Sequence, residues 1–333
     1  MNPKLLVWAV AVLLACGLSP VARAGSPTPE VVSVFPRDAA AFAFVDLQQA
    51  RSLAWFPELQ KRVLPDQLRQ FEQLLASPEM DRHSLVEEMA WAVVSSGSQV
   101  QPSQGGDAPT DDETIIVALG QFSPESISSY FKAHKRSVLQ ERNYSLYPLS
   151  GAGDGGLFFC FVDSTEAVLA GRKELERVIG ILSNEEQSLL SNTDIAPLIL
   201  QSNGRSVLWA VLSAPRARQE MQELVPLVEE FPQAQQLLSK VRAVTLEIEA
   251  GSGIQSVFDA VCTSSDVAKT FAVLLQADLR YQASQAAKSS QDVTAFLDQA
   301  EVDPSGDSLD VTLHLTDDQV VGLLQNGTFS VRK

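Results

Sequence analysis

The spacing of apolar residues along the chain shifts between two periods, which predicts both strands and helices. Along Ser308–Leu315 every second residue is apolar, the pattern of a strand with one buried face. After the capping sequence Ser123-Pro124-Glu125, apolar residues recur from Ile127 at the i, i+3, i+4 and i+7 positions of one helix face. The two periods together predict an α+β fold in which a mainly antiparallel sheet has helices packed on one face.

The order of these predicted elements occurs twice. Each half reads as a strand, helical segments, two strands, a capped helix, further strands and a closing helix; Glu166–Gly171 is a closing strand of the first half. The second half joins its two central strands through Gly251-Ser252-Gly253, a tight hairpin turn. We therefore expect two tandem, duplicated units, 25–195 and 196–333, preceded by a separate segment 1–24.

Segment 1–24 has the pattern of a signal peptide. One lysine precedes the unbroken apolar run Leu5–Ala15, and Ala22-Arg23-Ala24 supplies the small residues of a cleavage site at Ala22 and Ala24. Eleven residues at 1.5 Å each are too short for a hydrocarbon core of roughly 30 Å. The chain is thus expected to be exported, to the periplasm or beyond the cell.

The same segment has a second interpretation. Leu13-Leu14-Ala15-Cys16 has the form of a bacterial lipobox, in which Cys16 becomes the lipidated first residue. A lipidated form would be tethered to a membrane face. We favour cleavage after Ala24, because the complete Ala-x-Ala site follows the apolar run. Lipidation is the one route by which we expect a membrane contact.

Charge narrows the classes of partner. The protein has a net charge of −16, and removal of residues 1–24, which hold two basic and no acidic residues, makes it −18. Such a chain repels phosphate backbones, so we expect no nucleic-acid partner. Apolar residues make up 45% of the sequence, enough for a substantial core. Cys160 and Cys262 lie in apolar, strand-like runs and are interpreted as buried thiols, with a disulfide as the alternative.

Motifs for cofactors or catalysis are missing from the sequence. Gly151–Gly156 satisfies G-x-G-x-x-G, but a strand follows where a nucleotide site needs a helix, so these glycines predict a hairpin. His83, His134 and His314 have no metal-ligand spacing. We predict no catalytic, cofactor-binding or metal-binding residues. Acidic residues that end or alternate out of strands are interpreted as solvated: Asp46, Asp163, Glu247 and Glu249.

One candidate interface remains. Leu53, Trp55 and Phe56 would form an apolar patch on the first helical segment, and exposed patches of this kind mark interaction surfaces. The alternative is that the three side chains pack into the core of the first unit. Phe131 and Phe271 lie on the apolar faces of two predicted helices. We expect that aspartate in place of either residue would prevent folding.

The chain that follows residue 24 begins like a known group of proteins. Val34–Ala40, the strand Phe44–Leu47, the helix led by Arg51 and the unit Gly120–Glu125 are similar to the opening and pattern of uncharacterised bacterial envelope proteins, which are domains of unknown function. The likeness covers most of the chain after residue 24. It implies a tandem α+β exported protein and transfers no catalytic residues.

These observations lead to three functional hypotheses. The first is a non-catalytic exported envelope protein that binds a protein partner or has a structural role. The second is a periplasmic carrier of an apolar ligand or lipid, which would need one continuous cavity lined by phenylalanines: Phe42, Phe44, Phe159 and Phe161. The third is a hydrolase with an unrecognised site, which would need buried carboxylates or a Ser–His pair in a cleft.

Overall fold

The structure is a computed structural model, and it describes residues 27–62, 64–80, 84–95, 112–150, 156–201, 204, 206–224, 236–251, 253–286 and 300–325. The signal-peptide segment, with Cys16, Ala22 and Ala24, lies outside these residues.

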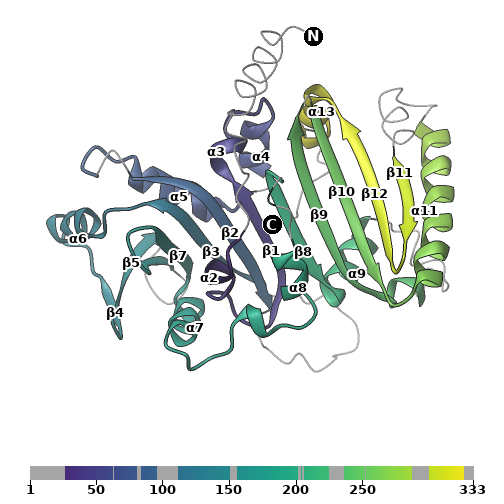
Figure 1. Ribbon diagram of the computed structural model, residues 1–333. Helices are drawn as coiled ribbons and strands as arrows, with labels where there is room; N and C mark the ends of the chain where they lie inside the picture. The colour runs from purple at the N-terminus through teal and green to yellow at the C-terminus, as the bar shows by residue number, and fades with distance from the viewer. Residues whose placement is uncertain are drawn as a thin grey trace, which may run out of the picture.

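A twelve-stranded sheet runs through the described part of the molecule (Figure 1), in the order β11-β12-β10-β9-β8-β1-β2-β3-β7-β6-β5-β4. Every neighbouring pair is antiparallel. The first seven strands are β1 (Ala39–Asp46), β2 (Leu85–Ser95), β3 (Asp112–Gln121), β4 (Leu139–Glu141), β5 (Tyr144–Ser150), β6 (Leu157–Phe161) and β7 (Glu166–Gly171). The other five are β8 (Leu208–Ser213), β9 (Val241–Gly251), β10 (Gly253–Cys262), β11 (Glu301–Ser305) and β12 (Ser308–Leu315).

The sequence-based prediction of an α+β fold with an antiparallel sheet is confirmed. The two predicted units share this sheet, because β1 pairs with β8 across the expected boundary, from Ala41 opposite Leu212 to Val45 opposite Leu208. We call β1–β7 the N-terminal half of the sheet and β8–β12 the C-terminal half. Outward from the β1–β8 pair, the halves begin alike: β1-β2-β3-β7-β6 on one side and β8-β9-β10-β12-β11 on the other.

Helices cover both faces of the N-terminal half, where the sequence led us to expect cover on one face. On the back face, α4 (Phe56–Arg62), α5 (Asp66–Leu75) and α6 (Pro124–Ala133) contribute to one core. On the front face, which Figure 1 shows towards the viewer, α2 (Pro29–Val32), α7 (Arg172–Leu182) and α8 (Ala196–Leu200) contribute to a second. Three short elements complete this half: α3 (Leu47–Ala50), the 3₁₀ turn Leu189–Ser191 and the bridge between Pro36 and Ser188.

Both faces of the N-terminal half are covered because its strands are apolar at consecutive positions. In β3, Ile115 and Val117 belong to the front core, while Ile116 and Ala118 belong to the back core, and all four are fully buried. Side chains alternate between the two faces of a strand, so such a run needs cover on both sides. The expectation of one covered face was therefore wrong for this half.

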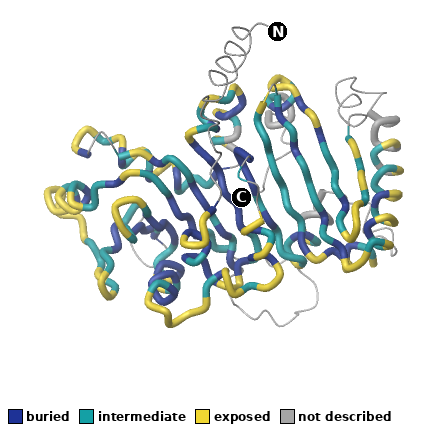
Figure 2. Tube along the Cα trace, in the orientation of Figure 1, coloured by how far each residue is buried: buried dark blue, intermediate teal, exposed yellow. Residues whose placement is uncertain are grey.

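The C-terminal half has helices on the back face alone in the part of the chain that is described. There, α11 (Ser265–Ala286) packs on β10, β11 and β12, and α13 (Asp317–Gln325) lies near the other end of β10. Helix α9 (Ala214–Leu224) contacts β8 and β9. Figure 2 shows the result: the central strands of the N-terminal half are largely dark blue, whereas β9–β12 are mainly teal.

Helix α11 is turned relative to the predicted face. The apolar residues after the capping sequence Ser264-Ser265-Asp266 predict a face of Val267, Phe271, Leu274 and Leu275 against the sheet, but Leu274 is 44% exposed. The alanines Ala268 and Ala272 are buried instead, and Phe271 and Leu275 pack beside them in a small third core. Small side chains at the contact let a helix approach the sheet closely, which the apolar pattern alone did not indicate.

Candidate functional site

The predicted apolar patch is part of the core. Trp55 is 1% exposed and Phe56 is 8% exposed, and both belong to the back core, with Leu53 packed against them. The three residues therefore take the second of the two predicted placements, and they offer no exposed interface. Trp55 lies just ahead of α4, where the chain returns over the sheet, so its large side chain fills the space between helix and strands.

The cysteines are free thiols, as favoured from the sequence. Cys160 and Cys262 are buried and unbridged, on β6 and β10 in opposite halves of the sheet. Burial raises the pKa of Cys160 to about 12, so its thiol stays protonated and is a poor nucleophile.

The four phenylalanines proposed to line a ligand cavity are divided between two cores. Phe42 and Phe44 belong to the front core, whereas Phe159 belongs to the back core with Phe161 packed against it. Their rings contact other rings, with centroids 6.1 Å apart for Phe42 and Trp209 and 5.1 Å apart for Phe71 and Phe159. The four side chains line no common cavity, which removes the observation that would have favoured an apolar carrier.

Of the acidic residues predicted to be solvated, Asp163 is exposed and Asp46 is buried, and both organise turns in the N-terminal half. Asp46 is 7% exposed, and its Oδ1 accepts a hydrogen bond from Gln49 N at 2.9 Å, which caps α3. Asp163 Oδ1 accepts bonds from the backbone N–H groups of Thr165 and Glu166 at 2.6 and 3.0 Å. Both aspartates are therefore engaged in holding the backbone.

Glu166 is the most perturbed acid of the N-terminal half. Burial, followed by repulsion from Asp163, raises its pKa to about 7. Burial, Cys160 and Glu166 also raise the pKa of the Tyr144 phenol. Tyr144 packs against the front core, and neither Tyr144 nor Glu166 lines the depression of the C-terminal half described below.

Histidines and metal-ligand clusters give no further site. His134 Nδ1 lies 2.9 Å from Tyr130 O, and its ring is 4.2 Å from the Tyr130 ring. Among the described residues, no three His, Cys, Asp or Glu side chains are grouped so as to hold a metal ion. His83 lies outside the described residues.

A polar surface in the C-terminal half differs from all of these. We call it the open face: the front-facing positions of β9, β10, β12 and β11, over which no helix of the described chain lies (Figure 1). It continues the sheet face that carries Trp209 and Val211 of the front core, as the strand registers require. Its positions are Thr245, Glu247, Glu249, Gln255, Val257, Asp259, Val261, Ser308, Asp310, Thr312, His314, Glu301, Asp303 and Ser305.

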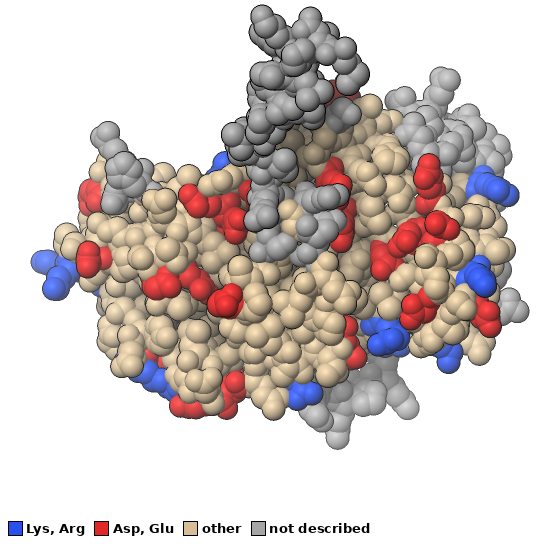
Figure 3. Space-filling view, in the orientation of Figure 1, with Lys and Arg blue, Asp and Glu red and all other residues tan. Residues whose placement is uncertain are grey.

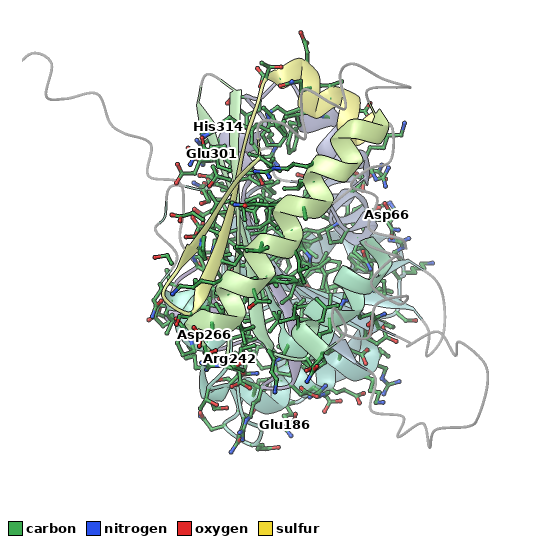
Figure 4. The ribbon with its side chains drawn as sticks, turned by 90° about the vertical axis from the view of Figure 1, so that its right-hand side faces the viewer. Asp66, Glu186, Arg242, Asp266, Glu301 and His314 are labelled. Carbon is green, nitrogen blue, oxygen red and sulfur yellow. The ribbon has the colours of Figure 1, made fainter. Side chains whose placement is uncertain are left out.

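The open face is acidic. Six of its positions are carboxylates and one is His314, and none is lysine or arginine. Figure 3 shows the acidic side chains spread over this part of the molecule, with basic ones at its lower and right-hand margins. In Figure 4, turned by 90°, His314 and Glu301 lie on the side of the sheet away from α11.

Three aspartates form a row across the open face. Asp259 of β10 lies directly opposite Asp310 of β12, which lies directly opposite Asp303 of β11. The Asp259 carboxyl lies within reach of the Ser308 hydroxyl and the Asp310 carboxyl. Burial, and then repulsion from Asp310 and Asp307, raises the pKa of Asp259 to about 6; burial and Asp303 raise that of Asp310.

The upper end of the open face is hollowed. Glu249, Gln255 and His314 lie side by side on β9, β10 and β12, and they border an open depression of about 550 Å³. The predicted β9–β10 hairpin is present there. Gly253 has φ +123°, and a Cβ at this position would lie 2.4 Å from Leu315 O, so the close approach requires glycine.

The sequence contains the signal for the open face only one strand at a time. Glu247 and Glu249 alternate out of their strand. Their combination with Asp259, Asp303 and Asp310 depends on the register between strands, which fixes which alternate positions share a face. Each strand alone shows its own alternation and says nothing about that register.

Comparison with known proteins identifies no family. No family model matches the chain, and no curated protein matches it. Among solved structures, it resembles three crystal forms of TP0453. The TM-scores are 0.48 for form I, 0.49 for form III and 0.48 for form IV, at 9%, 9% and 10% identity. Each match covers 89% of this chain and 96%, 97% and 95% of the respective TP0453 chain.

Proposed function

We propose that the chain is a non-catalytic protein of the bacterial envelope that binds a basic protein partner through the open face. The observation that carries this proposal is the contrast within one sheet. The front face of the N-terminal half is buried under helices, while that of β9–β12 is a polar, acidic surface without a covering helix in the described chain.

Export is supported by the sequence of residues 1–24, with its apolar run and Ala22 and Ala24 cleavage site. We propose a periplasmic or extracellular location, with Cys16 lipidation as the alternative route to a membrane face. In the part of the chain that is described, no helix is long and apolar enough to cross a membrane.

A non-catalytic role is supported by the reactive side chains, which have structural roles or are buried. The carboxylates of Asp46 and Asp163 hold backbone turns, and the Cys160 thiol is buried and protonated. Glu166 has a raised pKa but faces a packed core. A hydrolase would need a nucleophile, a base and a cleft in one place.

Charge selects the class of partner. Six carboxylates on four adjacent strands attract a surface rich in lysine and arginine, and the attraction steers the encounter. The same charge repels phosphate groups and anionic lipid headgroups. It also repels the equivalent face of a second copy, which opposes a face-to-face homodimer. A basic segment of another envelope protein is the occupant that fits.

Duplication of the sheet is part of this proposal. The same strand order outward from β1 and β8, each half with a helix after its third strand, supports an ancestral repeat. On this view the N-terminal copy acquired a front layer of helices and became a scaffold. The C-terminal copy kept its front face free for binding.

Site-specific crosslinking tests the proposed surface. A photo-crosslinking amino acid is placed at Thr312 in the middle of the open face or, as a matched control, at Thr270 on the exposed side of α11. The variants are expressed in the cell that makes the protein. We expect a protein adduct from position 312 that is missing from position 270, with crosslinked peptides rich in lysine and arginine.

The partner protein identified in the adduct is then purified on its own, and its affinity for this chain is measured. We expect the triple variant E247Q/E301Q/D303N to bind it at least tenfold more weakly than the unmodified protein at low salt, and high salt to reduce the difference. An adduct with lipid, with a second copy of this chain, or with a protein whose affinity does not depend on these charges would overturn the proposal.

A further inference from the structure

We propose that Asp259 and Asp310 share one proton on the open face, and that loss of this proton weakens the C-terminal half of the sheet. The inference concerns the protein alone and does not depend on the proposed partner.

The geometry favours a shared proton. Asp259 and Asp310 are cross-strand partners in β10 and β12, so their side chains leave the same face at neighbouring positions. The two carboxyl groups therefore lie within reach of a hydrogen bond to each other. Ionised carboxylates are acceptors only, and a bond between two of them therefore exists only when one carries a hydrogen.

In the part of the chain that the structure describes, no cation faces the pair to replace the proton. The groups that face the pair are acidic or neutral: Asp303 on β11, Asp307 in the β11–β12 turn, Glu247 on β9, Cys262 at the end of β10, and Thr245 opposite Asp259. The open-face positions hold no lysine or arginine. Asp259 is half-buried, and its Oδ1 is buried without a partner among the described residues.

The shared proton makes the C-terminal half of the sheet more stable at low pH than at high pH. The pKa of Asp259 lies above its ordinary value of 3.8, at about 6, so the fold favours the protonated acid. The stabilisation is complete below about pH 4 and is lost as the pH rises through about 6. At higher pH, two like charges face each other across β10 and β12, which weakens the pairing.

Substitution of one member by its amide tests the proposal. In Asp310→Asn the amide N–H donates to the Asp259 carboxylate without any shared proton. We expect this variant and the unmodified protein to melt together at pH 5, and the variant to melt about 2–4 °C higher at pH 8. Glu301→Gln, which removes one charge from the same face outside the aspartate row, is the matched control and should change the melting temperature much less.

Two results would overturn the proposal. One is an unchanged pH dependence of the melting temperature in both Asp310→Asn and Asp259→Asn. The other is a direct titration, followed by NMR of ¹³C-labelled aspartate carboxyls, in which the resonance lost in Asp259→Asn titrates at its ordinary value. The second measurement follows the unmodified protein; the variant serves to assign the resonance, and if it folds poorly the assignment is made from through-bond correlations to the Asp259 backbone.

Discussion

The two halves of the sheet differ on one face and resemble each other on the other. Both have helices on the back face, but the N-terminal half also has α2, α7 and α8 on the front, where the C-terminal half presents acidic strands. The difference is encoded in the strands themselves. β3 is apolar at consecutive positions, whereas β12 is apolar only at every second position. One sheet thus combines a buried scaffold in its N-terminal half with an accessible surface in its C-terminal half.

The largest expected effects are at two aromatic residues on back-face helices, which differ in burial. Phe131 of α6 is fully buried against Tyr147, with ring centroids 5.0 Å apart, while Phe271 of α11 is half-buried in the small third core. We expect Phe131→Ala to lower the free energy of unfolding by about 3–5 kcal/mol. We expect about 1 kcal/mol for Phe271→Ala, in keeping with partial burial. Urea unfolding measures both, and equal losses would contradict the contrast.

Aspartate at these positions repeats the contrast more severely. An unpaired charge in place of Phe131 has no access to water, and we expect that variant not to fold. Half-burial makes the same change at Phe271 less damaging than the sequence pattern suggested, because the carboxylate reaches solvent at the edge of α11. Circular dichroism of the two variants distinguishes them.

A second pair of substitutions tests whether the front face is buried in one half and accessible in the other. Val117 of β3 is fully buried in the front core, and Val257 of β10 lies on the open face. We expect Val117→Thr to cost about 1–3 kcal/mol, because its hydroxyl is buried without water. Val257→Thr should change stability by less than about 0.5 kcal/mol. A comparable loss at both positions would show that the open face is covered.

An ion pair between the halves gives a smaller effect. Arg216 of α9 in the C-terminal half lies 2.5 Å from Asp112 of β3 in the N-terminal half, and both side chains are largely buried. We expect Arg216→Met to lower the free energy of unfolding by about 1 kcal/mol, and 1 M salt to reduce the difference from the unmodified protein. The exposed pair between Arg142 and Glu185 is the control, and its loss should be smaller still.

The smallest expected effect is a pH dependence in the N-terminal half. Burial raises the pKa of Glu166 from 4.5 to about 7, so its stabilising contribution is present below pH 4.5 and lost as the pH passes 7. We expect Glu166→Gln to match the unmodified protein at pH 5 and to exceed its stability at pH 8, by at most about 1 kcal/mol after solvent screening. A variant that is less stable at pH 8 would contradict this sign.

Much of the fold could be predicted because local patterns determine the strands. Glu166–Gly171 and Ser308–Leu315 were predicted with the bounds that the structure has, and the Gly251–Gly253 turn joins the strands it was expected to join. The front helices α2 and α8 were missed because four and five residues are too few to show a helical period. Without them, the second covered face could not be anticipated.

The candidate site was harder to predict than the fold. Trp55 and Phe56 were plausible surface residues until the return of the chain over the sheet placed them in a core. The row Asp259–Asp310–Asp303 joins residues up to 51 positions apart, through two strand registers. Register is set by pairing between distant segments, and alternation within one strand does not contain it.

Cysteine labelling tests most directly whether the sheet is open on its front face in one half alone. Val257→Cys and Thr312→Cys lie on the open face, and Val168→Cys lies in the front core of β7. The native Cys160 and Cys262 are buried and serve as internal controls. We predict that iodoacetamide labels positions 257 and 312 in the folded protein, while position 168 reacts only on unfolding. Equal protection of all three positions would contradict the account.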